Sequence, residues 1–219
     1  MGNRNVKKEK QGNTASYQRE MLRNNIALLQ QKQIPESWPE LIVQKPLAIK
    51  EEVIGYCGYC LLAYDWIQPL AQWIGNRPCL EIMCGSGSLS KGLQNCGVKV
   101  QATDDHSWMK NHAISWFVDS WTEIEQQNAV AAIEKYGQKV DFVICSWPFS
   151  SEDCYQALLK MRETNPTARM IYIGEWRSGA NASDSFFNAA EFVEDESFVQ
   201  AVQRFKSLCG NSDKLYLLK

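Results

Sequence analysis

The sequence has no long hydrophobic run and few histidines. No apolar stretch in its 219 residues approaches the roughly 20 residues that a membrane-spanning helix requires. The N-terminus also lacks the apolar centre of a secretion signal. With only His106 and His112, the chain offers few ligands for a metal ion, and we predict no metal site. We therefore expect a cytoplasmic protein that does not enter a membrane.

Cysteine is frequent, with eight residues, but their pattern does not indicate a zinc site. Cys57 and Cys60 form an isolated C-x-x-C pair, without the second pair or spaced histidines that zinc needs. The pair lies in a helix-like stretch, whereas a thioredoxin-like pair lies between a strand and a helix. Several other cysteines fall in apolar, strand-like runs, where a thiol acts as a small hydrophobic side chain. We predict reduced core cysteines, which fits a cytoplasmic location.

A strong net charge is also absent. The net charge is −2, with 45% hydrophobic and 22% charged residues, which indicates a globular chain without bulk attraction to nucleic acid. The N-terminus differs, because seven basic residues against two acidic ones occur up to Lys32. We predict that residues 1–14 form a disordered tail. Its charges are sparse and few aromatic residues interleave them, so a solubilising role is favoured and nucleic-acid binding stays open.

The chain divides near residue 78. Apolar spacing predicts helices over 15–34 and 48–74, the second with a break before Pro69. From residue 78 onward, short apolar runs alternate with helical segments. The strands are predicted at 79–84, 98–103, 121–126, 140–147, 168–175 and 213–219, and the helices at 88–97, 129–137, 152–164 and 197–210.

Nearly continuous apolar strands that alternate with helices are typical of a parallel sheet covered on both faces. We predict an α/β, Rossmann-like, doubly wound fold with a mostly parallel, seven-stranded sheet. Residues 15–77 are assigned to an N-terminal helical extension that packs on the core, and residues 78–219 to the α/β domain.

The run "CLEIMCGSGSLSKGL" forms the end of the first strand, a glycine turn and the start of a helix. Doubly wound folds bind nucleotide-like ligands at this place. A dinucleotide fold would need a third glycine where Ser90 stands. The carboxylate of Glu81 would also repel a pyrophosphate. A cationic ligand is therefore favoured over a dinucleotide.

This run resembles the first motif of the class I S-adenosylmethionine-dependent methyltransferases, hydrophobic–(Glu/Asp)–x–Gly–x–Gly–x–Gly, with Met83 and Ser88 as departures. The resemblance implies that Glu81 orients the amino acid end of S-adenosylmethionine, through water or backbone. It also implies that Gly85 and Gly87 line the methionine and ribose portion.

Acidic and amide residues at two further strand ends extend the cofactor site. Asp104 follows Gly85 by 19 residues, a spacing at which an acidic side chain accepts hydrogen bonds from ribose hydroxyls. Asp105 is the alternative, and the sequence does not rank the two. The resemblance implies that Asn128 and Ala129 meet the adenine. Asp119 is the rival of Asn128, and either residue can instead cap a helix.

The catalytic candidates follow the fourth and fifth strands. Ser146, Trp147 and Pro148, with Phe149, resemble a degenerate form of the (Asp/Asn/Ser)-Pro-Pro-(Tyr/Phe/Trp) motif of amino-group methyltransferases. Either Ser146 or Trp147 would anchor the acceptor, and an aromatic lid over the cofactor is the alternative. Glu175 is a candidate base or amine anchor, or part of a surface turn.

Four aromatic residues of the extension are candidates for the pocket wall. Their helical spacing is equally typical of side chains that pack in the hydrophobic core. These residues are Tyr56, Tyr59, Tyr64 and Trp66. We predict an S-adenosylmethionine-dependent methyltransferase whose acceptor is unidentified, with a small molecule or protein favoured. A catalytically inactive cofactor-binding or scaffold protein is the alternative, and an NAD(P)-dependent oxidoreductase is third. The sequence does not decide between N-, O-, C- and S-methylation, or the oligomeric state.

Overall fold

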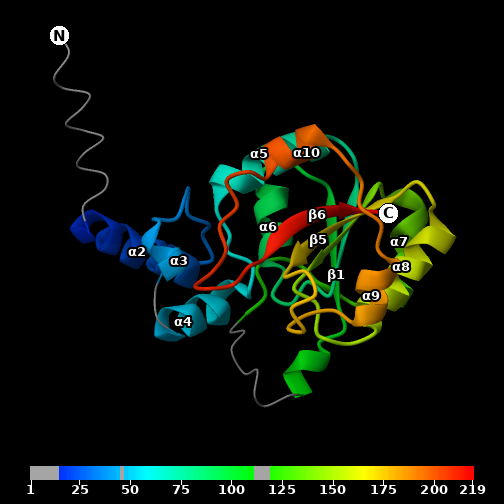
Figure 1. Cartoon of the computed structure of the whole chain (residues 1–219), viewed down its shortest axis with the longest axis horizontal. Helices are drawn as coiled ribbons and strands as arrows, with labels where there is room; N and C mark the ends of the chain where they lie inside the picture. The colour runs from blue at the N-terminus through cyan, green and yellow to red at the C-terminus, as the bar shows by residue number, and fades with distance from the viewer. Residues whose placement is uncertain (1–14, 45–46, 111–118) are drawn as a thin grey trace, which may run out of the picture.

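A computed structural model describes residues 15–44, 47–110 and 119–219 of the chain, and the predicted tail at residues 1–14 lies outside them. Its centre is a six-stranded sheet in the order β3-β2-β1-β4-β5-β6 (Figure 1). Five strands are parallel and β6 is antiparallel to β5. The strands are β1 (Cys79–Ile82), β2 (Val100–Asp104), β3 (Glu125–Gln126), β4 (Phe142–Ser146), β5 (Arg169–Gly174) and β6 (Lys214–Leu218).

The fold is the predicted Rossmann-like α/β fold, with six strands in the described residues instead of seven. Between β5 and β6 the chain forms two short helices, and Phe192 between them pairs with Leu218 only as an isolated antiparallel bridge, so no further strand is formed there. The α-helices are α2 (Ala15–Gln30), α3 (Leu41–Gln44), α4 (Leu47–Cys57), α5 (Tyr64–Ile74), α6 (Ser88–Asn95), α7 (Ala129–Tyr136), α8 (Asp153–Thr164), α9 (Asp184–Ala189) and α10 (Glu196–Ala201). The described residues also form two 3₁₀ helices, η1 (Ser107–Lys110) and η3 (Gly137–Lys139).

Several helix boundaries differ from the prediction, and the helix predicted over 15–34 ends at Gln30. The helical stretch 48–74 breaks at residues 58–63, not before Pro69, which lies inside α5. Gly58 has a φ of 85° and follows the end of α4, because glycine adopts without strain the left-handed conformation that terminates a helix. The helix predicted over 197–210 ends at Ala201, after which Gln203 N–H bonds the Gln200 carbonyl in a tighter turn. None of the described helices is both long and apolar enough to cross a membrane.

Helices cover both faces of the sheet, and side chains alternate between two apolar clusters. Ile144 and Ile171 face the cluster that includes α5, α6 and α10, whereas Val143 and Met170 face α7, α8 and α9 (Figure 1). This two-sided burial explains why the central strands are continuously apolar. Buried side chains of α2, α3 and α4 join the first cluster. The division into residues 15–77 and 78–219 stays a prediction, although both parts contribute to this one cluster.

The break between α4 and α5 is held in place by two buried indoles. Trp38 Nε1 donates to the Leu62 carbonyl at 2.7 Å, and Trp66 Nε1 donates to the Leu61 carbonyl at 3.0 Å. Buried carbonyls need such partners, so the loop has one well-defined course. It brings residues 57–60 to the carboxyl ends of the strands.

We expect Trp38→Phe to lower the free energy of unfolding by about 1–3 kcal/mol, because the Leu62 carbonyl loses its donor and a small void opens. Urea denaturation measures this change. Val199→Ala, at an exposed position, is the control and should shift stability by less than about 0.5 kcal/mol. Equal stability of the two variants would contradict this role of Trp38.

Candidate functional site

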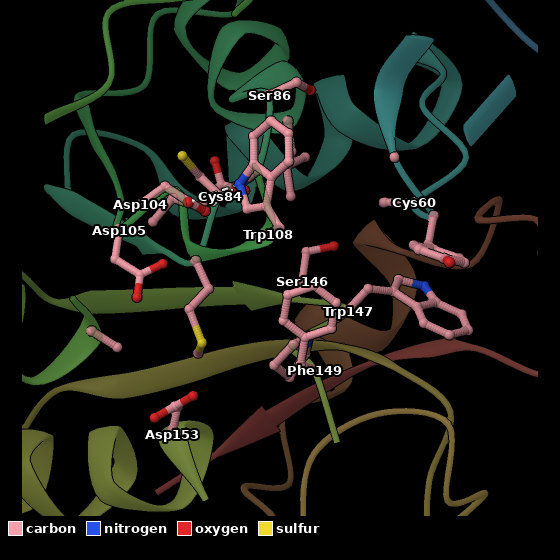
Figure 2. A pocket seen from close by; sticks show the side chains of 18 of the residues that line it. Cys60, Cys84, Ser86, Asp104, Asp105, Trp108, Ser146, Trp147, Phe149 and Asp153 are labelled. Atoms are coloured by element: carbon pink, nitrogen blue, oxygen red, sulfur yellow. Dashed lines mark hydrogen bonds between the residues drawn. The ribbon is translucent and has the colours of Figure 1, made fainter. Parts of the chain in front are cut away.

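A pocket with a cavity of about 160 Å³ lies at the carboxyl ends of β1, β2 and β4 (Figure 2). The segments that follow these strands form most of its wall. The first residues of α7 and α8 and the loop 57–60 complete it. The central place of β1 explains this arrangement, because Glu81 is paired with Ala102 of β2 and with Ile144 of β4. The pocket therefore lies at the place where doubly wound folds bind their ligands.

The turn after β1 has a left-handed backbone at alternate residues: φ is 52° at Met83, 57° at Gly85 and 69° at Gly87. Met83 thus takes the conformation of the glycine that the motif has at its position. The last glycine of the motif falls on Gly87, and Ser88 comes directly after it. Met83 therefore replaces a glycine of the motif, whereas Ser88 is not a departure from the motif. Such a conformation is uncommon for a residue with a side chain, and its strain is typical of functional sites.

The two motif glycines lie in different surroundings. Gly85 lines the pocket, whereas Gly87 is the N-cap of α6 and is not among the described lining residues. A Cβ atom on Gly87 would lie 3.0 Å from Thr122 Cγ2. Gly87 is therefore required by its φ and by close packing. Ser88 Oγ donates to the Cys57 carbonyl at 2.8 Å, which ties α6 to the loop 57–60.

Glu81 is a buried carboxyl group at the base of the pocket. It is 1% exposed and accepts a hydrogen bond from the Ser90 hydroxyl. Burial raises its pKa to about 7, opposed by the hydrogen bonds from Ser90 and assisted by the negative charge of Asp104. Ser90, which replaces the third dinucleotide glycine, thus supplies the partner that a buried carboxyl group needs. A nearby positive charge would stabilise the ionised form of Glu81.

Asp104 and Asp105 both line the pocket but differ in their contacts. Asp104 is 3% exposed and accepts from Gly85 N at 2.7 Å, from His106 N at 2.7 Å and from Trp108 Nε1 at 3.0 Å. Burial raises the pKa of Asp104, and these hydrogen bonds oppose the rise. Asp105 is exposed and accepts from Ser107 N at 2.8 Å. Asp104 therefore fixes the glycine turn, and Asp105 is the more accessible carboxylate.

Asn128 and Ala129 also line the pocket. Asn128 is the N-cap of α7 and accepts from Ala131 N at 2.9 Å, so the helix-cap alternative is confirmed for this residue. Asp119, its rival, is not among the described lining residues, and its carboxylate lies 3.5 Å from Lys32 Nζ.

The residues after β4 form an aromatic wall. Ser146, Trp147, Pro148 and Phe149 all line the pocket. The Trp147 indole stacks on Tyr59 with a centroid distance of 5.1 Å, and its N–H donates to Asp213 Oδ2 at 3.0 Å. Because this N–H is bound to Asp213, Trp147 presents an apolar ring. Of the two candidates, Ser146 then offers the polar side-chain group, and its role as anchor stays a prediction.

Glu175 is not among the described lining residues, and its Oε1 accepts from Ser212 N at 2.7 Å. Of the four aromatic candidates in the extension, Tyr59 lines the pocket. The Tyr56 hydroxyl accepts from Gln30 Nε2, the Tyr64 hydroxyl accepts from Asn95 Nδ2, and Trp66 is buried in the core.

Several features of the pocket and of the residues behind it were not predicted. Gly58 inside "CGYC" signals a helix end, and reading it would have placed Tyr59 and Cys60 in a loop. Asp213 meets Trp147 across 66 residues, and no local pattern indicates such a contact. Asp153 and Trp108 line the pocket from α8 and η1, where the sequence has no distinctive motif.

The charge of the pocket wall is one-sided. Four carboxyl groups line it, those of Glu81, Asp104, Asp105 and Asp153, and no lysine, arginine or histidine is among the described lining residues. The described part of the chain also contains no group of three or more residues arranged to hold a metal ion. Such a wall favours a cationic ligand and disfavours phosphates.

No protein-family model matches the sequence, and no curated protein matches it. Solved structures show partial likeness. Magnesium protoporphyrin IX methyltransferase from Synechocystis PCC 6803 with bound S-adenosylmethionine aligns with a TM-score of 0.45 and 14% identity, over 80% of this chain and 84% of that one. TehB from Haemophilus influenzae aligns with a TM-score of 0.45 and 14% identity, over 78% and 66%. Human N-acetylserotonin methyltransferase in complex with S-adenosylmethionine aligns with a TM-score of 0.41 and 10% identity, over 95% and 68%. At these scores, the likenesses identify neither a family nor a substrate for this chain.

The raised pKa of Glu81 predicts a pH-dependent stability. Between the ordinary value of 4.5 and about 7, the folded chain retains this proton whereas the unfolded chain releases it. The free energy of unfolding therefore falls as the pH rises through this window, by about 3 kcal/mol in full. Glu81→Gln should remove this component, as measured by urea denaturation of the ligand-free protein at several pH values.

The exposed Glu163 provides the matched control, because Glu163→Gln removes a carboxylate far from the pocket. Its pH profile should follow that of the wild type. Parallel profiles for the wild type and Glu81→Gln would show that Glu81 does not titrate as described.

Proposed function

We propose that this protein transfers a methyl group from S-adenosylmethionine to an acceptor, a small molecule or a protein. The observation that carries the proposal is the pocket wall, with its four carboxyl groups and no described cation, next to a glycine turn. S-adenosylmethionine bears an ammonium and a sulfonium group, which such a wall favours. The pyrophosphate of NAD(P) would meet four carboxyl groups without a counter-charge, which argues against the oxidoreductase alternative.

We propose that Glu81 acts on the amino acid end of the cofactor through water or backbone, because Ser90 already occupies its carboxyl group. Gly85 lets the ligand approach the main chain closely. Ser86 Oγ supports the presence of a polar ligand: it lines the pocket, the residue is 3% exposed, and this atom has no hydrogen-bond partner among the described residues.

The ribose and adenine contacts are proposed at β2 and α7. Asp105 is accessible to ribose hydroxyls, and Asp104 has spare acceptor capacity beside the hydrogen bonds that it already accepts. Ala129 is the first residue of α7, so its N–H has no acceptor within the helix and can donate to an adenine ring nitrogen. Asn128 shapes this helix start.

The cofactor supplies an activated methyl group and a good leaving group, so the chain's main task is positioning. We propose that Ser146, which lines the pocket at the end of β4, bonds the acceptor. Trp147 and Tyr59 form a packed aromatic pair that excludes water from this side of the pocket. A chain that binds S-adenosylmethionine but releases no S-adenosylhomocysteine with any acceptor would match the inactive scaffold alternative.

Calorimetry tests the cofactor. S-adenosylmethionine and S-adenosylhomocysteine should bind, and NAD and NADP should not, because of the charge of the wall. A melting-temperature series with the same four compounds is an independent check, since a ligand of the folded state stabilises it. Failure of both S-adenosyl compounds to bind, or binding of NAD instead, would refute the proposal.

Two aspartate variants separate ribose binding from support of the turn. Asp105→Ala should weaken cofactor binding about tenfold or more and leave the melting temperature nearly unchanged, because a charge-assisted contact contributes about 1.5–3 kcal/mol. Asp104→Ala should weaken binding and also lower the melting temperature, because it removes the contacts to Gly85, His106 and Trp108. Calorimetry and thermal denaturation measure both effects. Unchanged affinity in Asp105→Ala would leave the ribose role to Asp104 alone.

A further inference from the structure

We infer that Asp213 is a positioning residue of the pocket, which holds the Trp147 ring in the place where a bound ligand meets it. The inference rests on the proposed function, since it concerns the same pocket, and it adds a residue that is not among the described lining residues. Figure 2 shows Trp147 and Cys60 on the side of the pocket that lies away from Asp104 and Asp105. Asp213 therefore acts on the ligand only through Trp147.

The first support is the kind of acceptor that the pocket indoles use. Trp108 and Trp147 both line the pocket, and each donates its indole N–H to an aspartate, Asp104 for the first and Asp213 for the second. These two carboxyl groups are 3% and 2% exposed. Three indoles elsewhere in the described residues donate to main-chain carbonyls, namely those of Trp38, Trp66 and Trp121. A carboxylate forms the stronger hydrogen bond, so the pocket indoles are held more firmly than a neutral acceptor would hold them.

The second support is the backbone of Trp147. Its φ of 49° is uncommon for a residue with a side chain. The main-chain N–H of Trp147 donates to the Ile173 carbonyl of β5 at 2.8 Å, and the indole stacks on the Tyr59 ring at 5.1 Å. Together with Asp213, three segments that are far apart in the sequence thus fix one residue of the pocket wall. Backbone strain persists where the surroundings impose it, and it is typical of functional sites.

The third support is the unfavourable environment of Asp213 itself. Its Oδ1 has no hydrogen-bond partner among the described residues. Burial raises the pKa of this carboxyl group, and the negative charge of Glu175 adds to the rise. A neutral side chain would avoid this cost. The segment is nonetheless fixed, because Ser207 Oγ donates to the Asp213 carbonyl at 3.0 Å and Ser212 N donates to Glu175 at 2.7 Å. A costly carboxyl group retained on a fixed segment is expected where it serves a site.

The consequence for the pocket is preorganisation. A ligand meets a ring that is already in place, and it does not lose the free energy that ordering a mobile side chain requires. The charge of Asp213 also reaches the wall, since it follows burial among the causes that raise the pKa of the Cys60 thiol. The hydrogen bond must therefore be separated from the charge. Asp213→Asn does so, because asparagine keeps an acceptor oxygen but carries no charge.

Calorimetry of S-adenosylhomocysteine with the full chain is the first measurement. Asp213→Ala should weaken binding about three- to tenfold, because the released Trp147 ring must be ordered again when the ligand binds. Asp213→Asn should keep most of the wild-type affinity. Asn165→Ala is the control for stability alone: it removes hydrogen bonds to the Gly137 and Val140 carbonyls, away from the pocket. This control should lower the melting temperature and leave the affinity unchanged.

A double-mutant cycle tests whether Asp213 acts through Trp147. Trp147→Phe lacks the indole N–H and should itself weaken binding, so it keeps the test open even if Asp213→Ala does not fold. In the Trp147→Phe background, Asp213→Ala should cause little further loss of affinity. Equal losses in both backgrounds, wild-type affinity in Asp213→Ala or in Trp147→Phe, or no rescue by Asp213→Asn would overturn the inference.

Indole NMR signals of the ligand-free, ¹⁵N-labelled protein give a readout that does not depend on the cofactor. The Trp147 signal, identified by its absence in Trp147→Phe, should exchange slowly with water in the wild type and in Asp213→Asn, and faster in Asp213→Ala. Equal exchange in all three would contradict the inference. If the wild type does not bind S-adenosylhomocysteine, the proposed function fails, and the indole signal still decides whether Asp213 holds Trp147.

Discussion

The Asp104 carboxylate is the contact on which the geometry of the pocket depends. It joins the end of β2 to the glycine turn through Gly85 N and to the start of η1 through His106 N and Trp108 Nε1. The glycine turn and the chain that directly follows β2 are thereby fixed around one buried carboxyl group. A carboxylate at this depth requires such donors, because an unpartnered buried charge is costly. The hydrogen bonds that satisfy Asp104 are therefore the same ones that shape the pocket.

A second set of long-range contacts fixes the opposite side of the pocket. Trp38 and Trp66 fix the carbonyls of the loop after α4, and Ser88 ties the loop to α6. The loop presents Tyr59, which packs on Trp147, and Asp213 holds the indole of Trp147 from behind. The backbone of Trp147 has a φ of 49°, a conformation that persists where the surroundings impose it. Both sides of the pocket are thus held by tertiary contacts.

These contacts mark the limit of prediction from sequence. The sheet, the glycine turn and Asp104 were predictable, because strand periodicity and motif spacing are local properties. The loop after α4 was mistaken for helix, since Pro69 was taken as the break and Gly58 was not, whereas Pro69 lies inside α5. The hydrogen bond between Trp147 and Asp213 joins the end of β4 to the start of β6, and no local sequence pattern indicates it. Contacts of single residues depend on such partners, so the sequence offered Glu175 as a base, an amine anchor or part of a surface turn but did not indicate its hydrogen bond from the Ser212 amide.

The acidic pocket also links stability to ligand binding. Burial raises the pKa of Glu81 and also that of Asp104, so the ligand-free fold is least stable when both carboxyl groups are ionised. A cationic ligand reverses this relation, because it stabilises the ionised forms and gains affinity from them. A neutral pocket of the same shape would be more stable alone but would select less strongly among ligands. The sequence therefore retains carboxyl groups at positions where stability alone would favour neutral residues, as expected for a site that recognises positive charge.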